Sequence, residues 1–170
     1  MKFTAHLISG FLLALFASSP VHAQTSGSNT IIIEHPWARA TPAGAKTAAA
    51  YVTLINTGPS ADRLLGATSP VTDKIQFHKE SEENGVARMR ELQTVEVAAG
   101  AKVSFKPGDM HMMMVGLKQP LKEGQTIPLA LRFEKAGNID VTASVAKVGA
   151  MQPGDMDGMM HDADKAMKKK

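Results

Sequence analysis

Turn-forming residues interrupt this sequence at short intervals, and they limit what the chain can fold into. Gly-containing or Pro-containing pairs recur roughly every ten residues between positions 57 and 137. The segments between them are rich in β-branched and aromatic residues and are short for helices. About eight or nine strands are predicted, arranged as a β-sandwich or Greek-key barrel. The expected strands cover residues 30–34, 47–56, 63–68, 74–79, 86–97 with a break near Gln93, 102–105, 111–117, 126–133 and 138–148.

Residues 35–42 are the exception in the first half of the chain. Pro36 and Pro42 bracket this stretch, and proline lacks the N–H that a central strand needs. We expect the stretch to be extended but unpaired, as a connection between the first two strands.

The two ends of the chain differ in character from the β-rich middle. Residues 1–23 have a positive start, a short apolar run and a small-residue cleavage pattern at Val21-His22-Ala23, which is typical of a secretory signal peptide. We expect a flexible lead-in at 24–30, a β-domain at 31–148 and a flexible, disordered Met/His-rich tail at 149–170. The predicted location is the periplasm, with no membrane anchor.

Composition excludes several classes of function. The formal net charge is only +3, and no basic stripe is interleaved with aromatic residues, so nucleic-acid binding is not expected. The sequence has no cysteine, which removes thiol–disulfide exchange, Cys-based zinc sites, iron–sulfur clusters, blue-copper centres and a lipid-modified cysteine. No catalytic arrangement stands out, and an enzyme is not expected. Any soft-metal chemistry must use methionine and histidine.

The stretch Met110-His111-Met112-Met113-Met114 concentrates these soft donors. Alternate residues of a strand share a face, so His111 and Met113 would point one way and the other three methionines the other way. The first face then carries an imidazole and a thioether. The second face is interpreted as apolar packing.

A second His–Met pair follows from a predicted hairpin. Asn84-Gly85 is the strongest hairpin signal in the chain, and a two-residue turn there would pair Glu83 with Val86 and Glu80 with Met89. His78 would then lie diagonally across from Met89, roughly 7 Å away. A slip of one residue would break this arrangement.

Bringing both pairs together gives a four-ligand site of His78, Met89, His111 and Met113. Thioether sulfur suits Cu(I), imidazole suits copper in either oxidation state, and zinc or calcium would prefer other donors. Packing is the alternative interpretation, because a single methionine on a strand is usually core filling and a single histidine is usually structural.

The same four residues carry a family resemblance. Their spacing resembles the H-x10-M-x21-H-x-M signature of PCuAC periplasmic copper chaperones. The resemblance covers about residues 31–148 and implies a cupredoxin-like fold, Cu(I) bound by the four residues, and delivery to the CuA centre of cytochrome c oxidase subunit II, directly or through a Sco-type protein. Further similar segments are His35-Pro36-Trp37-Ala38-Arg39-Ala40, Ala49-Ala50-Tyr51, Gly116-Leu117, Pro120-Leu121 and Gly124.

The C-terminal tail leaves two interpretations open. It resembles the Met/His-rich extensions of some family members, so Met156, Met159, Met160 and His161 are candidates for a second copper site, with Cu(I) or Cu(II). A solubilising tail is the other interpretation. The chain is thus expected to be a monomeric copper(I) chaperone; the alternatives are a copper-buffering protein that uses the tail, and an interaction β-sandwich without metal.

Overall fold

The computed structural model describes residues 30–83 and 85–154, and these form an all-β domain without a helix. No described segment is a helix long and apolar enough to cross a membrane. The predicted β-class is confirmed. The strands are β1 (Ile31–Arg39), β2 (Thr47–Asn56), β3 (Asp62–Thr68), β4 (Lys74–Glu83), β5 (Val86–Leu92), β6 (Val95–Val97), β7 (Lys102–Ser104), β8 (Met110–Val115), β9 (Thr126–Phe133) and β10 (Asn138–Ala146).

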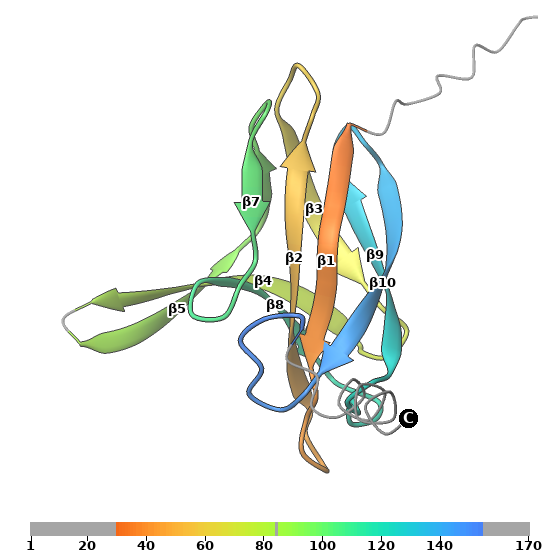
Figure 1. Cartoon of the computed structure of the whole chain (residues 1–170). Coiled ribbons are helices and arrows are strands. Elements are labelled where there is room, and N and C mark those ends of the chain that lie inside the picture. The colour runs from red at the N-terminus through yellow and green to blue at the C-terminus, as the bar shows by residue number, and fades with distance from the viewer. Residues whose placement is uncertain (1–29, 84, 155–170) are drawn as a thin grey trace, which may run out of the picture.

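The strands form one sheet that folds back on itself. Their order is β5-β4-β8-β2-β1-β10-β9-β3-β6, and β7 pairs with β2 beside this path. β1 and β10 are parallel, whereas the other neighbours are antiparallel. β3 also contacts β4, and β2 contacts β6, so distant parts of the path meet around the core. In Figure 1, β1, β2 and β10 lie in front of β3 and β9.

Strand alternation explains the core. Along β9, Ile127, Leu129, Leu131 and Phe133 are buried while the residues between them face outward or are half-buried. β8 contributes Met112 and Met114, both fully buried, and Met110 packs against the same cluster. The prediction that these three methionines form the packing face of the strand is therefore confirmed.

The prediction that residues 35–42 form an unpaired connection is wrong for its first half. β1 continues to Arg39, with Trp37 opposite Tyr51 and Ala38 opposite Ala50. The strand passes Pro36 because the register shifts between Glu34 and Trp37, and a bulge leaves the proline without a ladder bond to make. His35 lies within this bulge and has a φ of 48°, in the left-handed region.

The β4–β5 hairpin projects from the body of the domain, at the left in Figure 1. Glu83 pairs with Val86 and Glu80 with Met89, so the predicted register is confirmed. Gly85 has a φ of 74°, which suits glycine in a tight turn. β4 extends four residues beyond the predicted 74–79. The alternation of apolar residues ends near Phe77, but pairing with β5 continues through the polar residues 80–83. β5 pairs on one side only and is an edge strand of the sheet.

Two buried polar residues hold together another part of the sheet, and we call them the Asn56–Asp62 cluster. The Asn56 amide donates to the carbonyls of Ser60 and Val97 and accepts from the N–H of Gly58. The Asp62 carboxylate accepts from the backbone N–H groups of Arg63, Lys135 and Ala136. Burial alone would raise the pKa of Asp62, but these backbone bonds outweigh it and the pKa is lowered.

Candidate metal centre

Two imidazoles face each other where the projecting hairpin joins the domain. His78 of β4 lies directly opposite His111 of β8 in the antiparallel ladder. Their ring centroids are 5.7 Å apart and the ring planes are inclined by 80°. Directly opposed residues of neighbouring strands share one face of the sheet, so both rings point to the same side.

A thioether joins this pair from the neighbouring strand. Met89 of β5 is opposite Glu80, which makes it the diagonal neighbour of His78 as the sequence predicts. The Sδ atom of Met89 lies 3.1 Å from Nδ1 of His78. Met89 is 53% exposed, so the residue is accessible from solvent.

Met113 lies on the same face but further along β8. It is opposite Gln76 of β4 and Ala49 of β2, two residues beyond His111. Two residues of a strand span about 7 Å, so the side chain of Met113 begins about that far from His111 along β8. The methionine side chain is flexible. The structure thus gathers His78, Met89 and His111 closely and places half-buried Met113 beside them.

His111 is the buried member of this group, with 6% of its surface exposed. Burial lowers the pKa of its imidazole, and the nearby His78 and Arg39 add to this effect. A hydrogen bond with the backbone of Asp109 and the charge of Glu80 act in the opposite direction. The net effect favours the neutral ring, which is the form that binds metal ions.

An aromatic and cationic group borders the site, and the sequence did not predict its part in this face. Tyr51 follows Ala50, the partner of Met112, so it lies beside His111 on the adjoining strand. Its ring is 4.5 Å from that of Trp37, and the guanidinium carbon of Arg39 is 5.6 Å from its centroid. Burial raises the pKa of Tyr51, with Arg39 opposing and Glu80 reinforcing the shift. Tyr51 is identified as a neighbour of His111 only from the pairing of β2 with β8. No short turn joins these two strands, so the sequence has no local signal for their register.

The segment after β10 is anchored next to this group. Arg39 donates from Nε to the carbonyl of Ala150 at 2.7 Å and from its guanidinium to the Met151 sulfur at 3.3 Å. Ala150 is almost fully buried. The predicted tail ligands Met156, Met159, Met160 and His161 lie outside the described residues.

The donors of this candidate site are all neutral when both imidazoles are unprotonated. Imidazole nitrogen and thioether sulfur form a soft set that suits Cu(I), whereas hard cations prefer oxygen ligands. Within residues 30–83 and 85–154, no three His, Cys, Asp or Glu side chains form a metal-binding group. The sulfur atoms of Met89 and Met113 are the further candidate donors beside the two imidazoles.

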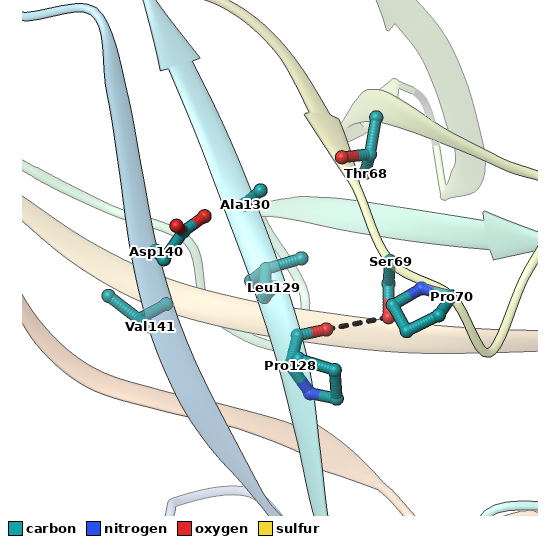
Figure 2. A pocket seen from close by; sticks show the side chains of 8 residues that line it. All are labelled: Thr68, Ser69, Pro70, Pro128, Leu129, Ala130, Asp140 and Val141. Carbon is teal, nitrogen blue, oxygen red and sulfur yellow. Dashed lines mark hydrogen bonds between the residues drawn. The ribbon is translucent and has the colours of Figure 1, made fainter.

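A shallow pocket elsewhere offers different chemistry. Figure 2 shows it between β3, β9 and β10, where the Ser69 hydroxyl donates to the carbonyl of Pro128 at 2.6 Å. Asp140 is the one ionisable residue that lines it, among small and apolar side chains. Its lining has no imidazole and no thioether.

Comparison with known proteins identifies the family of this chain. The family model described as "Putative lipoprotein LpqE-like" matches residues 31–145. The chain belongs to the LpqE-like family. A protein of Leifsonia xyli subsp. xyli named "Putative lipoprotein Lxx21020" is 32% identical to this LpqE-like chain over 147 residues, which are 83% of this chain and 87% of the relative.

Solved structures relate the LpqE-like chain to PCuAC domains. The apo PCuAC domain of PmoF2 is 30% identical, with a TM-score of 0.62 over 72% of this chain and 94% of that domain. Cu(I)-loaded DR1885 from Deinococcus radiodurans is 25% identical, with a TM-score of 0.59 over 76% and 85%. The predicted resemblance to PCuAC proteins and the cupredoxin-like β-fold are confirmed.

Proposed function

We propose that this protein is an exported copper(I) chaperone that binds its cargo through His78, Met89, His111 and Met113. The observation that carries the proposal is the contact between the His78 imidazole and the Met89 sulfur, at 3.1 Å, directly beside the ring of His111. Two imidazoles and an exposed thioether on one sheet face form a soft site that is open to exchange. Met113 is the fourth ligand of the proposal, one step along β8.

Copper is the cargo that the relatives support. The solution structure of DR1885 is that of a Cu(I) form, and it shares this fold. Neutral nitrogen and sulfur donors bind Cu(I) without adding negative charge to the site. A stronger ligand such as a thiolate can therefore take the ion from them. The chain acts in this proposal as a carrier without catalytic turnover.

The proposed acceptor is a respiratory copper centre. Delivery runs to CuA of cytochrome c oxidase subunit II, directly or through a Sco-type protein. Transfer proceeds by ligand exchange, in which acceptor thiolates displace the thioethers, because thiolate is the stronger ligand for Cu(I). The proposed location is the periplasm, after removal of the signal peptide 1–23, with the protein as a monomer. Attachment through a lipidated cysteine is not part of this proposal, because the sequence has none.

Anaerobic Cu(I) titration with X-ray absorption tests the proposed ligand set. About two sulfur and two nitrogen ligands are expected in the full chain. A His111→Ala, Met113→Ala double variant should lose most of the affinity, since it removes half of the donors. Unchanged affinity in that variant would rule out this site.

Truncation separates the chaperone from a copper store that uses the tail. The cut belongs after Gly154, because Ala150 is buried and its carbonyl accepts a bond from Arg39. The shortened protein should keep one tightly bound Cu(I). Loss of nearly all Cu(I) binding on truncation would favour the storage function instead.

A further inference from the structure

The two faces of the β4–β5 hairpin carry opposite charge. Residues that pair across the hairpin share a face, and alternate pairs point to opposite sides. We call the side with the proposed ligands the metal-bearing face; its residues are His78, Glu80, Glu82, Met89 and Glu91. The other side is the cationic face, with Lys79, Arg88 and Arg90.

The carboxylates of the metal-bearing face are not neutralised within the domain. Across residues 30–83 and 85–154, no ion pair joins Glu80, Glu82 or Glu91 to a lysine or arginine. On the cationic face, by contrast, Glu83 pairs with Arg88 at 3.0 Å. The separation of charge is thus a property of the hairpin surface and is not cancelled by neighbouring side chains.

Access to the proposed copper site runs over this acidic surface. Met89 is the exposed ligand, and its pairing partner Glu80 lies beside it, while Glu91 is opposite His78. The hairpin stands clear of the domain body in Figure 1, so a partner can lie along it. Met89 also borders a pocket on the cationic face, but a partner there would meet the side of the hairpin opposite to the imidazoles of His78 and His111.

We propose that the metal-bearing face is the docking surface for a copper acceptor whose metal-binding thiols are surrounded by lysine or arginine residues. This inference rests on the proposed copper function and adds the chemistry of the partner. Opposite charges across an interface speed the encounter and set its orientation, and they exclude partners of like charge.

The transfer itself balances without a redox partner. Copper remains Cu(I) throughout. Two Cu–thiolate bonds form on the acceptor as the Cu–thioether and Cu–imidazole bonds break, and the thiol protons pass to solvent. The imidazole and thioether donors are neutral throughout and are left without a bound ion.

Two synthetic dithiol peptides test the docking surface. Both contain a Cys-x-x-Cys sequence, flanked by lysines in one and by glutamates in the other. The measurement is the second-order rate of Cu(I) transfer from the loaded full chain. The lysine peptide should react about tenfold faster at low ionic strength, and this preference should shrink at high salt.

Two triple variants provide a matched comparison. Glu80→Gln, Glu82→Gln, Glu91→Gln should abolish most of the preference of the wild-type protein. Lys79→Gln, Arg88→Gln, Arg90→Gln removes as many charges from the other face and should leave the preference intact. Because flanking lysines also activate thiols, only the change in preference between proteins is diagnostic.

Three outcomes would overturn the docking proposal. The first is an unchanged preference in the glutamate variant, and the second is an equal loss in the cationic-face variant. The third is a fall in the Cu(I) affinity of the glutamate variant that is large enough to explain its altered transfer rates. The carboxylates would then act on the bound ion and not on the partner. Failure of loaded protein to transfer Cu(I) to either peptide would instead refute the chaperone function itself.

Discussion

The Asn56–Asp62 cluster and the metal-bearing face both carry polar groups, but they use them differently. Asn56 and Asp62 are almost fully buried, and every bond they make is to backbone groups of their own chain. On the metal-bearing face, His78 and Met89 contact each other at an exposed edge. The first region stabilises the fold, whereas the second keeps its polar groups accessible to solvent and to other molecules.

Asn56→Ala is expected to have the largest effect on folding. It leaves the N–H of Gly58 and the carbonyls of Ser60 and Val97 without their partner, at a cost of about 3 kcal/mol in the free energy of unfolding. Urea denaturation of the apo protein measures the loss. The Cu(I) affinity of the folded variant should stay unchanged, and a large fall would mean that the two regions are coupled.

His78→Ala should show the reverse pattern. Removing one of four proposed ligands should weaken Cu(I) binding about 100-fold, which is about 2.8 kcal/mol. The unfolding free energy of the apo protein should change by less than about 1 kcal/mol, since His78 is only partly buried. Competition titration with a Cu(I) chelator measures the affinity. An apo protein that loses several kcal/mol would instead make His78 a structural residue.

Acid should act on the Asn56–Asp62 cluster through Asp62. Its pKa is lower in the folded protein than in the unfolded chain, so its contribution is present above the unfolded pKa and is lost as the pH falls through the folded pKa. Asp62→Asn should cost about 1–3 kcal/mol at neutral pH, because one acceptor is lost. The stability difference between wild type and variant should shrink in strongly acidic solution. Denaturation curves across the acid range check this, and a constant difference would contradict it.

The smallest effects should separate neighbouring methionines of β8. Met114→Leu changes a fully buried side chain by a similar volume and should cost less than about 1.5 kcal/mol, with no effect on Cu(I). Met113→Leu should alter stability equally little but weaken Cu(I) binding about tenfold, because it removes a thioether donor. Equal Cu(I) affinities of the two variants would exclude Met113 as a ligand.

Local signals explain which parts could be predicted from the sequence. The turn signal Asn84-Gly85 in the sequence predicts the register in which Glu83 pairs with Val86, and with it the contact between His78 and Met89. The alternation of β8 separates the buried methionines from His111. Both inferences depend on residues close together in the chain, where turn chemistry and strand period are sufficient.

Long-range partners explain what could not be predicted. Asn56 reaches Val97 and Asp62 reaches Lys135, across 41 and 73 residues, and no local pattern encodes these bonds. The continuation of β1 past Pro36 depends on a bulge and on pairing with both β2 and β10. In each case tertiary pairing overrides the local preference.

The exposure of Met89 has a chemical consequence in an oxidising environment. Oxidation converts a thioether to a polar sulfoxide, and an accessible sulfur is the one an oxidant reaches first. Met112 and Met114, which are fully buried, are shielded from that reaction. The exposure that would open the proposed site to a partner therefore also leaves Met89 open to oxidative damage.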